Sequence, residues 1–176
     1  MKIGTLEFLS IENKKRLICA PTLQAIEQQN LNEVLVAEID PNLSDTAAFC
    51  EAYQTGTDIA VNCVIVEAKR GEDKWYAACM IPATKRADIN GVVRKSLDAK
   101  KISFAPKEVA VSLSGMEFGA INPIGLPADW RILVDSSAAA LEHIVIGSGL
   151  RGSKLLVSGK LLASLPNAEV LDLAKS

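Results

Sequence analysis

Two apolar stretches joined by a short charged turn constrain the fold of this chain most. Residues 59–66 (IAVNCVIV) and 75–81 (WYAACMI) have the composition of strands, and residues 69–73 between them read KRGED. Runs of β-branched and aromatic residues separated by a glycine-containing turn predict a hairpin. Parallel sheets need long crossover connections in place of such a turn. The chain is therefore expected to form a mixed β-sheet or a partly closed barrel, and not a regular parallel, doubly wound sheet.

Further strands and short helices fill the rest of the chain. Apolar periodicity predicts helices, the last of them a single turn, at residues 12–30, 45–53, 87–98, 106–114 and 160–165. Strands are expected at residues 34–39, 132–134, 144–146, 155–157 and 170–173. A length of 176 residues without a linker or repeat fits one α/β domain with peripheral helices. We expect residues 1–34 to be an N-terminal helical segment packed on the core, and residues 35–176 to be the main domain.

The net charge limits the kinds of partner. A formal charge of −2 argues against a large footprint on nucleic acid, because covering a duplex requires many phosphates to be neutralised. A short single-stranded end could still be held by a local basic patch. No apolar run is long enough for a signal peptide or a membrane span, so a cytoplasmic location is expected, with neither membrane nor DNA as a partner.

The cysteine and histidine content indicates no metal centre. The chain has one histidine, His143, and four cysteines without a CxxC pair, Cys19, Cys50, Cys63 and Cys79. Zinc sites require clustered thiolate and imidazole ligands, so neither a metal nor a cofactor is expected. The cysteines are interpreted as reduced core residues and His143 as a structural residue.

The segment from Gly119 to Gly125, GAINPIG, is the most unusual in the chain. Its glycines permit close approach of a ligand to the backbone, and Pro123 stiffens the loop. Such a loop can present N–H groups to a carbonyl or phosphate oxygen. Many connecting loops are equally rich in glycine and proline, so these physical arguments alone favour an ordinary connection.

A second glycine-rich segment, residues 147–154 (GSGLRGSK), combines hydroxyl groups with two cations. It contains neither a phosphate-binding Walker loop nor a dinucleotide-binding fingerprint. Anion binding and a tight turn with solvated cations are equally good interpretations. Ser136 and Ser137 follow Asp135 in a pattern typical of helix capping. Lys85 and Arg86 are the cationic pair expected to contact a phosphate.

These residues together resemble the YbaK/EbsC family of aminoacyl-tRNA deacylases, the prolyl-tRNA-synthetase insertion-like editing domains. GAINPIG is similar to the family's GxxxPxG signature. The preceding hairpin, the segment KKISFAPKEVAVSLSGMEFG and the later GSGLRGSKL turn follow in the family's order from about residue 35. The resemblance implies a trans-acting enzyme that hydrolyses the ester of a small, mischarged amino acid on tRNA. The partners it implies are the aminoacyl-tRNA 3′ end and an aminoacyl-tRNA synthetase.

The resemblance also implies which residues form the site. Gly119, Pro123 and Gly125 would form a catalytic loop that acts through backbone amides, without a metal. The substrate-binding residues would be Asn62, Ala120, Ile121, Asp135, Gly147, Ser148, Gly149 and Arg151. Lys85 and Arg86 remain the expected phosphate contacts.

Asn62 departs from the family pattern, which has a lysine at this place in the strand. An asparagine forms hydrogen bonds but brings no charge, and charge-assisted hydrogen bonds are about twice as strong as neutral ones. Lys85, Arg86 or Arg151 could supply the missing charge. The alternative function is a weak or inactive module that keeps the pocket and binds a nucleotide, an aminoacyl group or a protein.

Overall fold

The larger of the two main sheets carries the predicted hairpin. The computed structural model describes residues 1–175. The sheet has five strands in the order β11-β8-β6-β5-β7. In chain order these are β5 (Val61–Arg70), β6 (Asp73–Pro82), β7 (Lys101–Phe104), β8 (Arg131–Asp135) and β11 (Ala168–Leu171). β5 pairs antiparallel with β6 and β7, whereas β8 pairs parallel with β6 and β11, so the prediction of a mixed sheet is confirmed.

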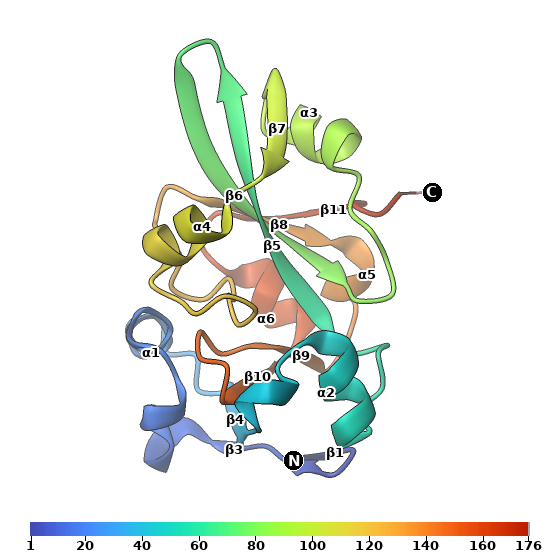
Figure 1. The fold of residues 1–176 in the computed structure, drawn as a ribbon. Coiled ribbons are helices and arrows are strands. Elements are labelled where there is room, and N and C mark those ends of the chain that lie inside the picture. The colour runs from blue at the N-terminus through green and yellow to red at the C-terminus, as the bar shows by residue number, and fades with distance from the viewer. Residues whose placement is uncertain (176) are drawn as a thin grey trace.

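The β5–β6 hairpin is longer than the sequence indicated. Its ladder continues to the pair Arg70 and Asp73, so the charged residues extend both strands instead of forming a wide turn. Gly71 adopts a φ of 60°, a left-handed conformation that glycine adopts without strain and that lets the chain reverse within two residues. Figure 1 shows the hairpin extending away from the second main sheet, with β7 and α3 alongside it.

The second main sheet has four antiparallel strands in the order β3-β4-β10-β9. These are β3 (Leu9–Ser10), β4 (Leu35–Glu38), β9 (Ile144–Gly147) and β10 (Ser153–Val157), and a separate pair is formed by β1 (Lys2–Ile3) and β2 (Leu6–Glu7). A single parallel bridge between Ala60 and Val145 joins the two main sheets. Each sheet keeps two edge strands, so the strands of residues 1–175 do not close into a barrel.

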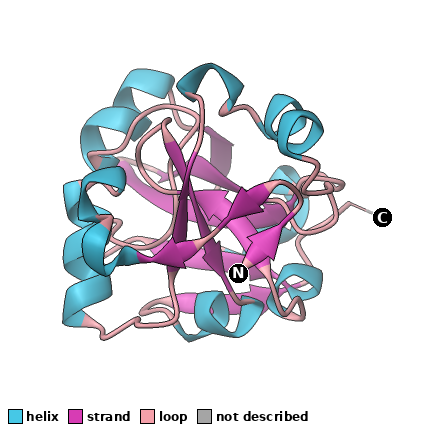
Figure 2. Ribbon diagram, turned by 90° about the horizontal axis from the view of Figure 1, so that it is seen from below, coloured by secondary structure: helices cyan, strands magenta, loops and turns pink. Residues whose placement is uncertain are grey.

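Short helices surround the strands, as Figure 2 shows. The α-helices are α1 (Ala20–Gln28), α2 (Thr46–Tyr53), α3 (Arg94–Ser96), α4 (Lys107–Ser114), α5 (Ser136–Ala139) and α6 (Gly159–Ser164). Three 3₁₀ turns, η1 (Ile11–Asn13), η2 (Lys15–Leu17) and η3 (Pro41–Leu43), and a π-helix, η4 (Ile89–Val93), complete the set. The prediction of peripheral helices is confirmed. None of the helices in the described chain is long and apolar enough to cross a membrane.

Two apolar clusters hold the layers together. The larger one lies between the two main sheets and includes Met80, Val134, Ile146 and Leu155, none of which exposes more than 2% of its surface. The other covers the opposite face of the five-stranded sheet beneath η4. Burial of apolar surface is the main stabilising contribution to a fold of this kind.

The N-terminal segment differs from the predicted helical one. The α-helix begins only at Ala20, because Pro21 fits a first helical turn, where the missing N–H has no partner in any case. Residues 2–10 form short strands instead of helix, and β3 pairs with β4 at the edge of the four-stranded sheet.

Two elements between residues 87 and 104 also differ from expectation. The predicted helix at 87–98 is divided into η4 and α3, and the Asp88 carboxylate caps it by accepting hydrogen bonds from the N–H groups of Gly91 and Val92. Strand β7 was not expected, since its residues are mostly exposed and show no apolar alternation. It forms because its backbone pairs with β5.

Candidate functional site

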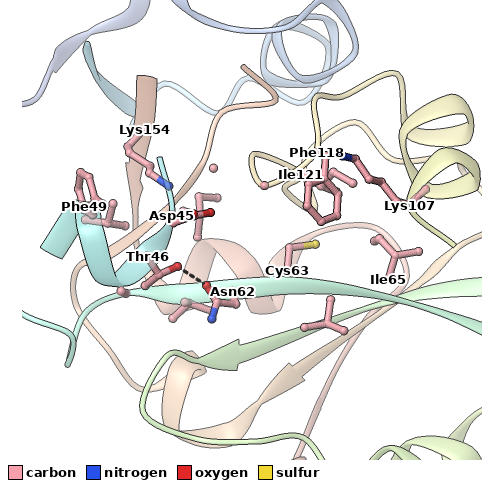
Figure 3. A pocket seen from close by; sticks show the side chains of 18 of the residues that line it. Asp45, Thr46, Phe49, Asn62, Cys63, Ile65, Lys107, Phe118, Ile121 and Lys154 are labelled. Carbon is pink, nitrogen blue, oxygen red and sulfur yellow. Dashed lines mark hydrogen bonds between the residues drawn. The ribbon is translucent and has the colours of Figure 1, made fainter. Parts of the chain in front are cut away.

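A central pocket of about 380 Å³ lies where the two main sheets meet. We use this name for the cavity whose wall is made by α2, the first half of β5, the start of the 119–125 loop, β9 and β10. The residues most relevant to its chemistry are Asp45, Asn62, Cys63, Gly119, Ile121 and Lys154. Figure 3 shows the side chains of Asp45, Asn62, Cys63, Ile121 and Lys154, which come from segments far apart in the sequence, around the pocket.

The loop of residues 119–125 needs glycine at both ends. Gly119 has a φ of 81° and Gly125 a φ of 94°, in the region that L side chains rarely adopt. A Cβ at Gly119 would lie 2.6 Å from Nη1 of Arg151, and one at Gly125 would lie 2.3 Å from the carbonyl oxygen of Pro21. The positive φ therefore requires glycine at both positions, and at Gly125 the close approach of the α1 backbone also leaves no room for a side chain.

The N-terminal segment supports the 119–125 loop through buried hydrogen bonds. The Thr22 hydroxyl donates to the Ile124 carbonyl oxygen at 2.8 Å and accepts from Nδ2 of Asn122 at 3.0 Å. The Oδ1 of Asn122 in turn accepts from the N–H of Ile124 at 2.8 Å. Both polar side chains are fully buried, and buried polar groups are costly when unpaired. Sequence reasoning missed this network because it joins residues about 100 positions apart.

Two backbone amides of the loop are available to a ligand. Gly119 and Ile121 line the central pocket, and within residues 1–175 no hydrogen bond uses the N–H of either residue. The N–H of Ala120, between them, donates to the Glu117 carbonyl oxygen at 3.0 Å. Unpaired N–H groups in a rigid loop can bind an oxygen that carries negative charge.

The turn after β9 mainly supports the loop. The N–H of Gly149 donates to the Ala120 carbonyl oxygen at 2.8 Å, and a Cβ at Gly147 would lie 2.3 Å from that oxygen. The Ser148 hydroxyl is buried and donates to the Leu150 carbonyl oxygen at 2.9 Å. Of residues 147–149, only Gly147 lines the central pocket.

Arg151 connects two loops and does not contribute a cation to the central pocket. Its guanidinium group donates to the carbonyl oxygens of Phe118 at 3.1 Å and of Pro41 at 3.3 Å. Arg151 is not among the residues that line the central pocket. It therefore ties the 119–125 loop to the η3 turn, and the charge expected near Asn62 has to come from other residues.

Asn62 lies on β5 at the floor of the pocket. Its Oδ1 accepts a hydrogen bond of 2.7 Å from the Thr46 hydroxyl at the start of α2, drawn as a dashed line in Figure 3. Within residues 1–175 its Nδ2 has no hydrogen-bond partner. Thr46 thus orients the amide so that its acceptor is occupied and its donor is left for a ligand.

Lys154 is a buried cation at the pocket. It extends from β10 toward the pocket on the side of Asp45, as Figure 3 shows, and only 6% of its surface is exposed. Its Nζ donates to the Ser44 carbonyl oxygen at 2.8 Å and lies 5.1 Å from the centre of the Phe49 ring. Burial lowers the pKa of Lys154 to about 8.

Sequence reasoning did not assign Lys154 to the pocket, because anion binding and a tight turn with solvated cations were equally good interpretations of the glycine-rich segment that contains it. The available signal was a lysine inside the strand SKLLV, which is buried along its whole length. Lysine is almost never fully buried without a partner, so its presence there indicates a specific role.

Cys63 lines the pocket beside Asn62 but is a poor nucleophile. Burial raises the pKa of its thiol, with a smaller contribution from Cys79, so the thiolate does not form near neutral pH. Lys107 lies at the opposite rim, with its Nζ 4.6 Å from the centre of the Phe118 ring.

The expected phosphate contacts lie beside the pocket. Lys85 and Arg86 line a cavity of about 470 Å³, the side cavity, which shares Asn62, Val64 and Phe104 with the central pocket. Lys85 donates to the Ser137 hydroxyl at 2.9 Å, and its Nζ is 3.9 Å from Oδ1 of Asp135.

Asp135 does not line the central pocket, contrary to expectation. Its carboxylate accepts from the N–H of Ser137 at 3.0 Å and from the N–H of Leu173 at 3.0 Å. Burial acts to raise the pKa of Asp135, but these hydrogen bonds hold it below its usual value. The residue caps α5, as the sequence indicated, and fixes the C-terminal segment.

Three expected loop residues also lie away from the pocket wall. Pro123 and Gly125 line a separate surface cavity against α1, and Ala120 is 1% exposed in the interior. They support the loop, while Gly119 and Ile121 form its pocket face. Within residues 1–175, no group of three or more histidine, cysteine or acidic side chains is placed to hold a metal ion.

Comparison with known proteins agrees with this arrangement. Residues 40–165 match the family described as "Aminoacyl-tRNA editing domain". The proline–tRNA ligases of Listeria monocytogenes and Listeria welshimeri are 29% and 27% identical over 66 residues, which is 37% of this chain and only 12% of each ligase.

Solved structures share the fold. A crystal structure described as a candidate trans-editing enzyme for prolyl-tRNA synthetase superposes with a TM-score of 0.76 at 17% identity, over 89% of this chain and 96% of that one. A candidate signal transduction protein from Marinobacter aquaeolei has a TM-score of 0.54 at 18% identity, over 86% of this chain and 30% of that one. The family match covers more than half of the chain, so this protein belongs to the aminoacyl-tRNA editing domain family.

Proposed function

We propose that this protein is a trans-acting aminoacyl-tRNA deacylase that removes a small, mischarged amino acid from the 3′ end of tRNA. The observation that carries the proposal is the pair of unpaired amides, Gly119 and Ile121, in the wall of a pocket that belongs to an editing fold. The placement of Asn62 and Lys154 around the same pocket supports it.

The amides would act on the ester carbonyl group. In the tetrahedral intermediate the carbonyl oxygen becomes negatively charged, and preorganised N–H groups bind that charge more strongly than they bind the ground state. Water adds to the carbonyl carbon, the bond to the ribose oxygen breaks, and that oxygen receives the proton. The products are the free amino acid and tRNA with a free hydroxyl group. The raised pKa of Cys63 speaks against attack by a thiolate.

Lys154 would supply the positive charge that Asn62 lacks. Within residues 1–175 its one hydrogen bond is to a neutral acceptor, the Ser44 carbonyl oxygen, so its charge can still be offered to an anionic group. A buried cation interacts strongly with an anion because the local dielectric constant is low. This arrangement favours an active enzyme over the inactive module that Asn62 alone would indicate.

Pocket size would set amino-acid selectivity. The apolar wall includes Cys63, Ile65, Ile121 and Val145, and the volume of about 380 Å³ must also admit the terminal ribose. Large side chains would be excluded by contact with this wall. Discrimination between near-isosteres should be incomplete, since one methylene group changes selectivity only by about 10- to 200-fold.

A panel of mischarged tRNAs tests the function. Purified protein is incubated with tRNAs carrying alanine, serine or cysteine, and ester loss is followed for the wild type, Asn62→Lys and Lys154→Met. The proposal predicts ester loss by the wild type on at least one tRNA and a large loss of rate in Lys154→Met. A wild type that is inert on every tRNA while Asn62→Lys gains activity would instead support the binding module.

A further inference from the structure

The charged residues of this protein are strongly segregated, although its net charge is only −2. Besides the central pocket and the side cavity, a third cavity of about 630 Å³ lies beside the β5–β6 hairpin, and we call it the hairpin cavity. The residues that line these three cavities include nine lysines and arginines but only two acidic residues. The remainder of the chain carries ten cationic and nineteen acidic residues.

The three cavities adjoin one another through shared wall residues. Asn62, Val64 and Phe104 line both the central pocket and the side cavity. Asn90 lines both the side cavity and the hairpin cavity. We define the basic track as the cationic residues of the last two cavities: Lys69, Lys85, Arg86, Arg94, Lys100, Lys101 and Lys175.

The basic track follows the hairpin away from the pocket. Strand β5 runs from Asn62 at the pocket floor to Lys69 at the hairpin cavity, and β7 places Lys101 directly opposite Lys69. In Figure 1 this part of the molecule, with β7 and α3 beside the hairpin, extends beyond the main body. The only acidic residue lining the track, Glu67, is already paired with Lys69 at 2.9 Å.

Two exposed aromatic residues stand at the entrance to the pocket. The exposed fractions are 65% for Phe104 and 51% for Phe118, and both residues line the central pocket. Large apolar side chains left in water at the mouth of a polar site indicate a ligand with flat, apolar faces. Nucleobases stack on such rings, while cations alongside bind the phosphates.

We propose that the basic track binds the phosphate backbone of the tRNA acceptor arm, and that Phe104 and Phe118 stack with the bases of its unpaired 3′ end. The inference rests on the proposed function for the identity of the RNA. The distance along β5 from Asn62 to Lys69 is roughly 23 Å at the rise of a strand. At about 3.4 Å per stacked nucleotide, this corresponds to roughly seven nucleotides. Such a length covers an unpaired end and the first base pairs of a stem.

Charge reversal at the far end of the track tests the proposal. Lys100 and Lys101 are exposed and do not line the central pocket, so Lys100→Glu with Lys101→Glu should leave the fold intact. The matched control is Lys2→Glu with Lys160→Glu, which makes the same change of net charge at exposed positions outside all three cavities. Binding of 5′-labelled, unfractionated tRNA is measured by fluorescence anisotropy between 50 and 200 mM salt, a range of about fourfold.

The track variant should bind tRNA at least about tenfold more weakly than the wild type. The salt dependence of its affinity should correspond to about two fewer phosphate contacts. The affinity of the control should stay within about twofold of the wild type. Equal binding by the track variant and the wild type overturns the proposal, as does an equal loss in the control. Ester hydrolysis by the same variants, measured on aminoacyl-tRNA, separates the two claims. If the track is wrong and the function right, the track variant hydrolyses aminoacyl-tRNA like the wild type. If the function is wrong, no ester is lost although tRNA binding still depends on the track.

Discussion

Lys154 places a buried positive charge at the central pocket, a role that its position in the glycine-rich segment 147–154 did not indicate. The strand around it is buried, so its ammonium group is held at the central pocket by Ser44 and Phe49 without full compensation of its charge. Asn62, by comparison, was identified from the sequence because it departs from an expected lysine. The hydrogen bond that orients it comes from Thr46, sixteen positions away, and could not be predicted.

Lys154 should make stability depend on pH in the alkaline range. Burial lowers its pKa from 10.5 to about 8 in the folded protein, so between these values the unfolded chain binds more protons. The free energy of unfolding should therefore rise from pH 8 to pH 10.5, by roughly 3 kcal/mol at most from this group. Urea denaturation of Lys154→Met should lack this rise, and Lys2→Met, at an exposed position, should keep it. An unchanged rise in Lys154→Met would contradict the buried charge.

Phe104 should contribute to substrate affinity through stacking. Its side chain is 65% exposed, so Phe104→Ala should fold normally. Loss of one base contact is worth about 1–3 kcal/mol, which predicts a KM for aminoacyl-tRNA raised by roughly 5- to 150-fold. The comparison is Leu113→Ala on α4, which exposes a similar apolar side chain that does not line the pocket. An equal KM in the two variants would argue against stacking.

At the scale of elements, the hairpin was predictable and the N-terminal segment was not. The β5–β6 hairpin is encoded locally, by two apolar runs and a glycine turn. Strand β7 carries no apolar pattern, because pairing with β5 is all that defines it. The contact of α1 with the 119–125 loop depends on a buried hydrogen-bond network between residues distant in the sequence. The sequence therefore indicated a helix and a loop, but it could not show that the two are in contact.

Removal of the Thr22 hydroxyl should loosen the 119–125 loop. Thr22→Val keeps the side-chain shape but leaves the Ile124 carbonyl oxygen unpaired in the interior, and it leaves Nδ2 of Asn122 with only the weak sulfur acceptor of Met116 at 3.7 Å. An unsatisfied buried polar group costs about 1–3 kcal/mol, so the free energy of unfolding should fall by about this amount. Thr84→Val, at an exposed position, should change stability by no more than about 0.5 kcal/mol. A similar small effect for Thr22→Val would show that the network does not stabilise the fold.

At the scale of the molecule, the sequence gives the amount of charge but not its distribution. The net charge of −2 averages the basic track over an acidic remainder, so it does not reveal where cations gather. The cations of the basic track come from β5, α3, β7 and the residue before it, the segment after β6 and the segment after β11, and only folding brings them together. The same holds for the central pocket, whose wall joins residues 45 to 154.

An acidic protein with this basic track should bind tRNA with strong salt dependence. If three or four phosphates are contacted, affinity should fall by roughly 10- to 100-fold when monovalent salt rises from about 50 to about 200 mM. Anisotropy titrations of the wild type at fixed pH measure this directly. Affinity that does not change with salt would exclude phosphate contacts as the main source of binding.

The most direct test of the central claim compares two glycine variants in one assay of ester loss from mischarged tRNA. Gly119→Ala places a Cβ against Arg151 and displaces a pocket amide, whereas Gly71→Ala imposes a similar positive φ in the hairpin turn, where a Cβ would meet nothing. Loss of one oxyanion donor lowers kcat by about 100- to 1000-fold, so Gly119→Ala should lose about that much activity while Gly71→Ala keeps the wild-type rate. Equal rates for Gly119→Ala and Gly71→Ala, or no acceleration by the wild type over spontaneous hydrolysis, would contradict the account.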